Sequence, residues 1–541
     1  MNSNQNKDPR RRRLSIDGVS PRPSRSGGSI GFDKPGSSRP ESRKLDDFGR
    51  SEGFTARNSS NVLIDIPKRP KFDTPESKKR GLFGRRKHGR LDSFDKKKRR
   101  KRRLKIAAVL ILILVTLFGF LMAKGYINLR KIFAGGGSAA ALEENVDPSK
   151  LRVEGDGRIN ILVLGRGGLG HEGPDLTDTI ILVSIDPISK KAGLVSIPRD
   201  LYVSVPGEGS MKINSVYYTG KAEVLNHTSE RGKAVEKRAQ ASGFNLVEKT
   251  VEDVLGVPVH YHVMVDFSGF KEAINTVGGV DINVPQAVYE NMRIDGRNYT
   301  LNVKPGPHHF QGFEALAYSR SRHTSSRGDF DRAERQRLMI VALKDKILSL
   351  STFSNPAKLS KLSDQFGNHV QTNFSTGDIT KLYELVKTIK SSKVRSIGLS
   401  DPPNDFVTTA YMNGLSIVLP TAGLNNYDAI RYYIRTVLRD SYLNMENARI
   451  VILNGSGRPG LARDKAHELR SYGYWVVKED NAPANLDYPK TTIIDMKHGD
   501  KKYTRHYLEK RFGVQATDNV SDPALKAYDA DFVIILGNGN S

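Results

Sequence analysis

The sequence predicts an α/β protein held at a membrane, with one large folded domain and a small second one. From about residue 158 to residue 440, short apolar runs typical of buried strands alternate with segments that place apolar residues at helical spacing. A shorter alternation of the same kind follows from about 446 to 541. A single long apolar run, well before both, supplies the membrane anchor.

The positive charge is concentrated at the N-terminal end. Of the net charge of +26 on 541 residues, residues 1–105 carry +20, from 32 Lys and Arg against 12 Asp and Glu, which leaves about +6 for the rest. A nucleic-acid-binding domain would gather such charge on a folded surface. Residues 1–105 are instead rich in Ser, Pro, Gly and Arg, which predicts a disordered cytoplasmic tail whose basic stretches lie against anionic lipid headgroups.

An uncharged apolar run of eighteen residues, Ile106–Ala123, predicts a transmembrane helix. It can cross a hydrocarbon core of about 30 Å when the flanking Lys105 and Lys124 reach the headgroups. No periodic segment adjoins it, which disfavours a buried core helix, and a cleavable signal peptide has a shorter apolar run nearer the N-terminus. Because Lys96–Lys105 is basic at every position but one, we expect a single-pass cell-membrane protein with its N-terminus in the cytoplasm and its domains outside.

Residues 124–154 are expected to form a linker. Three consecutive glycines at 135–137 and a short run of alanines favour a flexible tether between the membrane and the first domain. The chain has no cysteine. Disulfide frameworks, thiolate nucleophiles and cysteine metal sites are therefore excluded.

In the large domain, three buried strands come first. They are predicted at 159–164, 180–185 and 192–197, and a turn at 187–191 joins the last two. Amphipathic helices follow, interleaved with short strands at 262–265 and 280–284. The helices are expected at 234–255, 268–277, 312–321, 332–350, 379–390 and 427–438.

The small domain repeats this pattern on a shorter scale. A glycine-rich loop at 454–460 joins its first strand to its first helix, a position where loops can cradle phosphate. The loop has neither the dinucleotide-binding nor the P-loop spacing, so a tight turn is the favoured interpretation. Strands are expected at 449–453, 475–478, 492–495 and 532–536, and helices at 461–472 and 503–512.

Two charged residues are expected to meet at one end of the hairpin formed by the second and third strands. If the turn is centred between Ile188 and Ser189, antiparallel pairing places Asp178 opposite Arg199, with an error of about two residues in register. Both then lie beside a glycine-rich loop, 165–177, at an end of the sheet, where functional sites are usually assembled. The alternative interpretation is a plain cross-strand salt bridge.

The segment 319–337 carries six arginines and no lysine. Arginine holds a phosphate or carboxylate through two parallel hydrogen bonds, so this composition is typical of an anion pocket. A solvated, charge-mixed helix start is the alternative. The direction of the side chains decides between the two.

The same segment is predicted to start a helix whose buried stripe ends in polar residues. Asp329 or Asp331 can cap this helix. The apolar positions 340, 343 and 347 share one stripe, and steps of three and four residues carry it back to Gln336 and Arg332. Because buried polar groups need partners, these side chains form either a structural ion pair or the wall of an anion pocket. The arginines expected at the helix edges or on the surface are Arg327, Arg335 and Arg337.

A carboxylate among several arginines suits a diphosphate. Arg199, joined by the arginines of segment 319–337, would neutralise the nonbridging oxygens, while Asp178 can hold a divalent metal that bridges the phosphates. Phosphoryl transfer is accelerated mainly by positioning and charge stabilisation, so this set is sufficient for it.

Seven ordered motifs between about 155 and 350 resemble the LytR-CpsA-Psr family. The final segment looks like the LytR C-terminal domain that often follows it, through residues 451–457, 460–462 and 533–537. The seven motifs are Asn160-Ile-Leu-Val-Leu-Gly165, Leu176-Thr-Asp-Thr179, Leu194-Val-Ser-Ile-Pro-Arg-Asp200, Lys212-Ile-Asn214, Gly278-Gly-Val-Asp281, Ala315-Leu-Ala-Tyr-Ser-Arg-Ser-Arg322 and Gly328-Asp-Phe-Asp-Arg-Ala-Glu-Arg-Gln336.

The resemblance implies a three-layer α/β catalytic domain with a mixed sheet at 155–440 and a LytR C-terminal domain at 446–541. It implies a transferase that moves a glycopolymer, such as teichoic acid or capsular polysaccharide, from a polyprenyl-diphosphate carrier to peptidoglycan at the outer membrane face. Mg²⁺ is the implied cofactor, and no nucleic acid is expected as a partner. The site residues carried over by motif are Asp178 (also the magnesium ligand), Arg199, Arg320, Arg322, Asp329, Arg332 and Gln336, with Lys212 and Arg335 as further substrate contacts.

The chain departs from the family pattern at two positions. Many members carry an aspartate just after the first strand and an arginine shortly before the Asp-Thr pair, where Gly167 and Leu176 stand here. Hypothetical replacements for the missing acid are His171, Glu172 and Asp175. The candidate bases for the acceptor hydroxyl are Asp329 and Asp200. Three other functions stay open: hydrolysis of the same lipid diphosphate, a catalytically idle wall-binding scaffold, and a DNA-binding transcriptional attenuator.

Overall fold

The computed structural model describes residues 135–323, 325–349, 369–483, 488–520 and 523–539. The predicted tail, 1–105, and the predicted membrane span, 106–123, lie outside these residues. Within the described ranges, no helix is long and apolar enough to cross a membrane.

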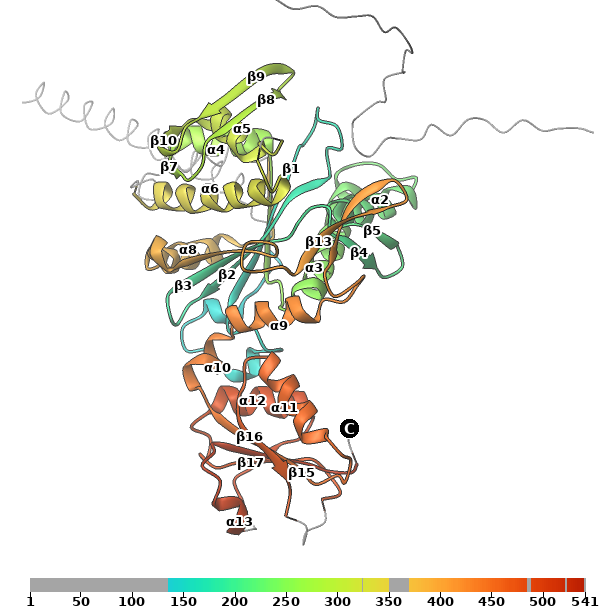
Figure 1. The fold of residues 1–541 in the computed structure, drawn as a ribbon, viewed down its shortest axis with the longest axis vertical. Coiled ribbons are helices and arrows are strands. Elements are labelled where there is room, and N and C mark those ends of the chain that lie inside the picture. The colour runs from blue at the N-terminus through green and yellow to red at the C-terminus, as the bar shows by residue number, and fades with distance from the viewer. Residues whose placement is uncertain (1–134, 324, 350–368, 484–487, 521–522, 540–541) are drawn as a thin grey trace, which may run out of the picture. The chain divides into compact units, whose positions relative to one another are not determined.

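A six-stranded mixed sheet forms the centre of the large domain (Figure 1). Antiparallel pairing joins β1 to β2 and β2 to β3, whereas β1 pairs with β6, and β3 with β12, in parallel. The four inner strands are those that the sequence predicted. In spatial order the strands are β11 (Val370–Thr372), β6 (Tyr261–Asp266), β1 (Ile159–Arg166), β2 (Thr177–Asp186), β3 (Lys191–Ser196) and β12 (Val394–Gly398).

Helices cover both faces of this sheet, which makes the domain three-layered (Figure 1). Because side chains alternate along a strand, Leu162 and Leu182 face one layer of helices while Ile161 and Ile185 face the other. The helices on the first face are α2 (Val216–Asn226), α3 (Lys233–Leu255) and α9 (Asp428–Val437), and α8 (Thr376–Lys387) lies on the second.

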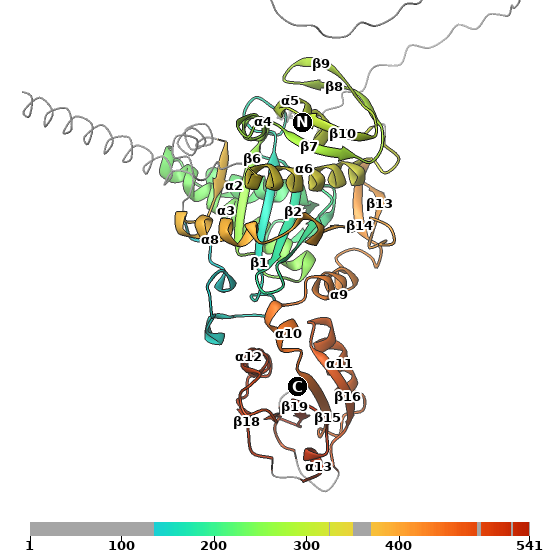
Figure 2. The same ribbon diagram turned by 90° about the vertical axis from the view of Figure 1, so that its left-hand side faces the viewer.

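Two hairpin-like ribbons lie together with three helices (Figure 2). A separate cluster of buried side chains, which includes Ile274, Phe310 and Tyr318, joins them. The ribbons pair β7 with β10 and β8 with β9. The helices and β7 were predicted, but the β8–β9 ribbon was not. The elements of this part are α4 (Phe267–Thr276), β7 (Val280–Val284), β8 (Val288–Ile294), β9 (Arg297–Val303), β10 (Gly306–Phe310), α5 (Gly312–Arg320) and α6 (Asp329–Ser349).

Two more hairpins belong to other parts of the large domain. They pair β4 (Tyr202–Val205) with β5 (Gly209–Lys212) and β13 (Val407–Met412) with β14 (Leu415–Pro420).

Helix α6 buries more of its surface than one amphipathic stripe. It begins at Asp329, so both acids predicted as caps lie in its first turn, where negative charge stabilises a helix N-terminus. Arg335 and Arg337, which we expected at the edges or surface, are buried, as is Met339. Arg335 reaches toward α5 and Arg337 toward β12. The edge prediction is therefore wrong, because α6 lies between two layers and both sides of it find partners.

The β2–β3 hairpin has the predicted register. Asp186 pairs with Lys191, which centres the turn where the sequence placed it. Continued along the two strands, this register sets Asp178 opposite Arg199, and their side chains form an ion pair. The predicted meeting of these two residues is confirmed.

Residues 135–154 are packed, so the flexible tether that we expected there is wrong for this stretch. The backbone N–H of Gly137 donates to the carbonyl of Asn373, and a Cβ on Gly137 would lie 2.6 Å from the ring of Tyr261. Leu151 is fully buried among side chains of the small domain. The glycines here allow close backbone approach rather than flexibility.

The small domain is a five-stranded sheet in the order β16–β15–β19–β17–β18, with α11 and α12 packed in its largest core cluster. The side chain of Asn454 accepts the N–H of Ser456 and donates to the carbonyl of Arg458, so the glycine-rich loop is the predicted tight turn. The elements are α10 (Ser441–Glu446), β15 (Arg449–Asn454), α11 (Leu461–Ser471), β16 (Trp475–Asn481), β17 (Thr492–Asp495), α12 (Lys502–Phe512), β18 (Ala516–Thr517), α13 (Pro523–Lys526) and β19 (Phe532–Leu536).

Leu151→Ala tests whether the stretch before β1 is structural. Removing a fully buried leucine side chain is expected to lower the free energy of unfolding by about 2–5 kcal/mol, measured by chemical denaturation. Leu169→Ala is the matched control, because Leu169 is 98% exposed and its loss should change stability by less than about 0.5 kcal/mol. Equal, small losses in the free energy of unfolding for both variants would support a flexible tether instead.

Candidate functional site

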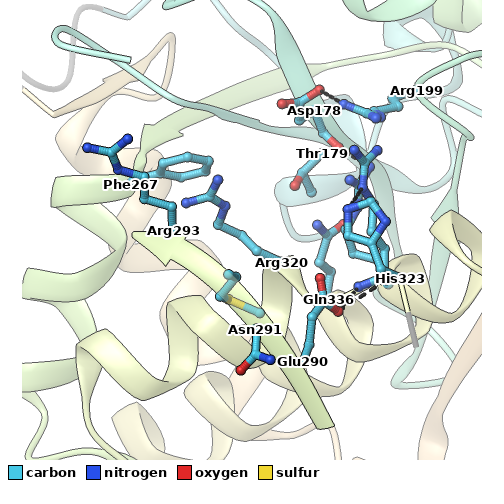
Figure 3. A pocket seen from close by; sticks show the side chains of 13 residues that line it. Asp178, Thr179, Arg199, Phe267, Glu290, Asn291, Arg293, Arg320, His323 and Gln336 are labelled. Atoms are coloured by element: carbon cyan, nitrogen blue, oxygen red, sulfur yellow. Dashed lines mark hydrogen bonds and ion pairs between the residues drawn. The ribbon is translucent and has the colours of Figure 1, made fainter. Parts of the chain in front are cut away.

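A cavity of about 360 Å³ opens between the β2–β3 end of the sheet, helices α5 and α6, and the β8–β9 ribbon (Figure 3). Five arginines from four separate parts of the chain line it, against two carboxylates. The lining residues are Asp178, Thr179, Arg199, Phe267, Glu290, Asn291, Met292, Arg293, Arg320, Arg322, His323, Arg332 and Gln336.

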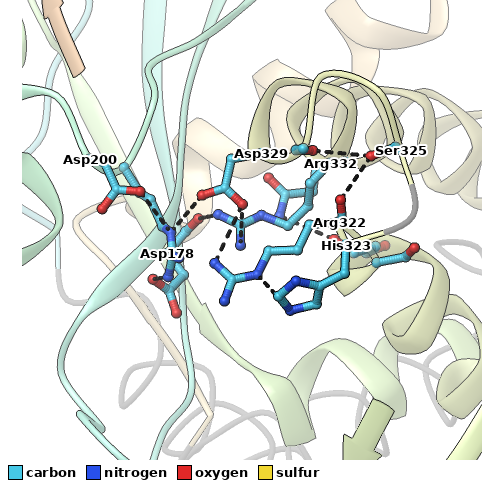
Figure 4. Close-up of polar contacts among 12 residues, drawn as sticks. Asp178, Asp200, Arg322, His323, Ser325, Asp329 and Arg332 are labelled. Carbon is cyan, nitrogen blue, oxygen red and sulfur yellow. Dashed lines mark hydrogen bonds and ion pairs between the residues drawn. The ribbon is translucent and has the colours of Figure 1, made fainter. Parts of the chain in front are cut away.

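Arg199 joins the sheet to α6, because it contacts both Asp178 and Asp329, which are labelled in Figure 4. Its Nη1 lies 2.8 Å from Oδ1 of Asp178, and its Nε lies 2.9 Å from Oδ2 of Asp329. Asp200 approaches the same Nε at 3.6 Å. Burial opposes the charge of Arg199, but Asp178 and Asp329 outweigh it and raise the guanidinium pKa. Arg199 is thus a fixed cation at the cavity wall.

Asp329 lies behind the arginines rather than in the cavity lining. Besides Arg199, it contacts Nη1 of Arg332 at 3.1 Å and Nη1 of Arg322 at 3.7 Å. Burial would raise the carboxyl pKa of Asp329, but Arg332 and Arg199 overcome it and lower that pKa. A carboxylate held ionised by three arginines balances their charge and fixes their positions, and it is a poor proton acceptor.

Burial disfavours the charged form of two further arginines, Arg332 and Arg320. Desolvation lowers the guanidinium pKa of Arg332, although Asp329 opposes the shift, and it lowers that of Arg320, against the attraction of Asp178. The guanidinium of Arg320 lies 4.7 Å from the centre of the Phe267 ring, a cation–π distance. Taking these cations out of water is costly unless an anion joins them, so the cavity is built for a multiply charged anion.

The structure brings most of the motif residues together. Asp178, Arg199, Arg320, Arg322, Arg332 and Gln336 line the cavity, and Asp329 supports them from behind. Lys212 does not line it: its Nζ lies 3.0 Å from Oδ1 of Asp200. Arg335 is also outside the lining, because it donates to the carbonyl of Ser321 and lies over the Tyr318 ring. Lys212 and Arg335 thus lie outside the cavity lining, and contact of either side chain with the substrate stays a prediction.

Sequence reasoning missed the β8–β9 ribbon, which supplies Glu290, Asn291, Met292 and Arg293 to the cavity. Buried and exposed residues alternate along these strands, and the sequence shows the matching alternation of apolar and polar residues. A glutamate at a position predicted to face inward was the available signal, since buried acids are rare unless they are paired.

Glu290 anchors the loop that carries two of the arginines. The residue is 4% exposed, and its Oε2 accepts from the Oγ–H of Ser321 at 2.7 Å, the N–H of Arg322 at 2.7 Å and the N–H of His323 at 3.1 Å. Three donors on one charged oxygen make strong hydrogen bonds. Glu290 therefore fixes the backbone between Arg320 and Arg322.

The protein groups fit a magnesium ion only in part. Across the described residues, no group of three or more His, Asp or Glu side chains is placed to hold a metal. Asp178 lines the cavity with a half-exposed carboxylate that already contacts Arg199. Because Mg²⁺ usually takes one or two carboxylates and completes its shell with phosphate oxygens and water, this donor set fits an ion shared with a diphosphate.

The candidate replacements for the acid missing at Gly167 lie outside the cavity lining. Both carboxylate oxygens of Asp175 are occupied, one by Arg166 and the other by Lys221 at 3.0 Å. The ring of His171 packs edge-on against Phe267, and a Cβ on Gly167 would meet the Cβ of His171 at 2.9 Å. None of the three replacement candidates, His171, Glu172 and Asp175, lines the cavity.

Comparisons with known proteins agree with the motifs. The model of the LytR_cpsA_psr family matches residues 129–421, and the model described as LytR cell envelope-related transcriptional attenuator matches residues 447–539. The chain is 33% identical over 227 residues to the Bacillus subtilis protein named "Polyisoprenyl-teichoic acid--peptidoglycan teichoic acid transferase TagV", which covers 41% of this chain and 51% of that protein.

A second relative is the "Cell wall biosynthesis protein LcpA" of Corynebacterium glutamicum, 30% identical over 329 residues, or 59% of this chain and 62% of that protein. The chain thus spans between about half and two thirds of the length of these relatives. Among solved structures, the crystal structure of B. subtilis TagV is 29% identical and covers 52% of this chain and 97% of that chain, with a TM-score of 0.39.

Glu290→Gln is expected to weaken the binding of inorganic pyrophosphate to the full-length protein about three- to tenfold, measured by calorimetry, because the charged acceptor of three hydrogen bonds becomes neutral. Glu223→Gln on α2, an exposed glutamate, is the control and should bind like the wild type. A lowered affinity at an unchanged melting temperature identifies a positioning role. Wild-type affinity in Glu290→Gln would contradict it.

Proposed function

Because the chain belongs to the LytR-CpsA-Psr family, we propose that it transfers a glycopolymer from a polyprenyl-diphosphate carrier to peptidoglycan and so makes a phosphodiester link. The polymer is of the teichoic acid or capsular polysaccharide class. The observation that carries the proposal is the convergence of five arginines on one cavity beside Asp178. A diphosphate has the charge that such a cavity needs, and the names of the matched relatives refer to cell-wall assembly.

The proposed reaction is an in-line displacement at the phosphorus that carries the glycan. A hydroxyl of peptidoglycan forms the new P–O bond and releases its proton, while the bond to the second phosphate breaks and polyprenyl phosphate leaves with the electron pair. Negative charge grows on the leaving phosphate. Arg199, Arg320 and Arg332 are placed to stabilise that charge, and their fixed partners spare reorganisation during the step.

Asp178 is proposed to hold Mg²⁺ jointly with the diphosphate. When bound, the ion would neutralise phosphate oxygens and polarise the phosphorus. Asp329 and Asp200, the candidate bases from the sequence, both contact Arg199 outside the cavity lining. We therefore propose that Asp329 and Asp200 offset the positive charge of Arg199 and do not accept the proton of the acceptor hydroxyl.

We further propose that the folded domains act outside the cell, with the apolar run at 106–123 as the anchor. A polyprenyl carrier is a membrane lipid, so an anchored enzyme and its donor would diffuse in the plane of the same membrane. A DNA-binding role is disfavoured by the small net charge of the chain beyond residue 105.

The transferase is tested by incubating the full-length protein in detergent with a polyprenyl-diphosphate-linked glycan, a peptidoglycan oligomer and magnesium. Arg199→Lys and Arg332→Lys are each expected to lower kcat/KM at least about a hundredfold, because lysine cannot reproduce the bidentate contacts. Arg297→Lys on the β8–β9 ribbon, outside the cavity lining, is the matched control. Release of glycan phosphate without linkage would make the protein a hydrolase, and absence of any turnover would make it a scaffold.

Asp178→Asn tests the magnesium assignment. Removing the single carboxylate proposed to hold the metal should raise the magnesium concentration for half-maximal turnover about tenfold or more, since an amide is a weaker ligand for a hard cation. His171→Ala, Glu172→Gln and Asp175→Asn, combined in one protein, should leave that concentration unchanged by comparison. A magnesium dependence that follows the triple variant instead would place the ligand in the loop.

A further inference from the structure

A second cavity, of about 600 Å³, lies at the other end of the β2–β3 hairpin. Five cations line it, Arg158, Lys191, Lys393, Arg395 and Arg439, with Asp186 as the acid among its lining residues. Along β2, the eight residues from Asp178 to Asp186 put about 27 Å between the two cavities at a rise of about 3.4 Å per residue. The two cavities are therefore separate sites.

Three of these cations lie together and make no ion pair among the described residues. The parallel register of β3 and β12 pairs Val394 with Ala192, so one step back sets Lys393 beside Lys191, and Arg395 shares their face. No hydrogen bond or ion pair from the described residues reaches the side chains of Lys191, Lys393 or Arg395, and all three are exposed. Like charges on neighbouring strands destabilise a sheet. An anionic ligand would remove that penalty.

Gly193, which also lines this cavity, lets the end of α9 pack close against β3. Gly193 pairs with Arg395, and a Cβ there would lie 2.5 Å from Cδ2 of Leu438. A larger residue at this position would push the end of α9, which also lines the cavity, outward.

The other charged side chains of this cavity already have partners. Arg158, almost fully buried, donates from Nε to Oγ of Ser184 at 2.7 Å and lies 3.6 Å from Asp186. Both oxygens of Asp186 also accept from the turn, through the N–H of Ile188 and the Oγ–H of Ser189. The C-terminus of α9 adds only about half a negative charge. Arg439 donates to the carbonyl of Gly473 and to the side chain of Asn447. The charges of Lys191, Lys393 and Arg395 are left without such partners in the part of the chain that the structure describes.

From this arrangement we propose that the second cavity binds an anionic group, phosphate or carboxylate, of a cell-wall polymer. The choice of polymer rests on the proposed function. If the arginine cavity takes the diphosphate, the second cavity at the other end of the sheet would take a part of the polymer remote from the reacting phosphorus. A polymer that spans the two cavities would then be held at a second point, which raises its local concentration at the reacting end.

The test measures binding of the full-length protein, in detergent, to two insoluble or polymeric ligands without any donor lipid: peptidoglycan sacculi stripped of phosphate polymers, and purified teichoic acid. Lys393→Gln combined with Arg395→Gln is expected to weaken binding to at least one of them fivefold or more. Lys237→Gln combined with Lys249→Gln removes the same charge from exposed positions on α3 and should bind like the wild type.

The ligand that loses affinity identifies the source of the anion, carboxylate for stripped peptidoglycan and phosphate for teichoic acid. Wild-type binding of both polymers by the Lys393 and Arg395 double variant would overturn the proposal. Because no turnover is required, the result is separate from that of the transferase assay. Weakened binding in a protein that transfers nothing would keep the second site and remove the transferase.

Discussion

The ion pairs of Arg199 determine how the candidate site is assembled. One guanidinium contacts Asp178 on β2 and Asp329 at the start of α6, so a single side chain fixes the helix against the end of the sheet. Asp329 then contacts Arg332 and Arg322, which orders the remaining cations around the same point. In a cavity so rich in arginine, these two carboxylates offset part of the repulsion among the cations.

Prediction succeeded where one local rule decides the geometry. The tight turn after Asp186 and the period of two along a strand fix the register of β2 and β3, and that register alone brings Asp178 to Arg199. It failed where partners come from distant segments. Arg337 is buried because Ser396 and Asp401 happen to meet it, and Gly137 is packed because Tyr261 lies beside it. Neither contact can be predicted from the hydrophobic periodicity of the sequence around Arg337 or Gly137.

The small domain is tied to the large one through a buried acid rather than a flexible joint. Oδ2 of Asp440 accepts from the N–H groups of Gly155 and Gly157 and from the Tyr507 hydroxyl, and Oδ1 accepts from the start of α10. Burial raises the carboxyl pKa of Asp440, yet these donors favour its ionised form. Through these hydrogen bonds, Asp440 fixes the segment before β1 relative to α12.

The loss of an acid at Gly167 becomes intelligible when the packing around the loop is considered. The place of that side chain is closed by His171, whose ring leans on Phe267, and Phe267 in turn supports Arg320. A carboxylate added at Gly167 would displace His171 and disturb the surface on which Arg320 rests. The loop therefore supplies aromatic support for Arg320 at the place where many members of the family carry an acid. In the cavity itself, the carboxylates that accompany the arginines are Asp178 and Glu290.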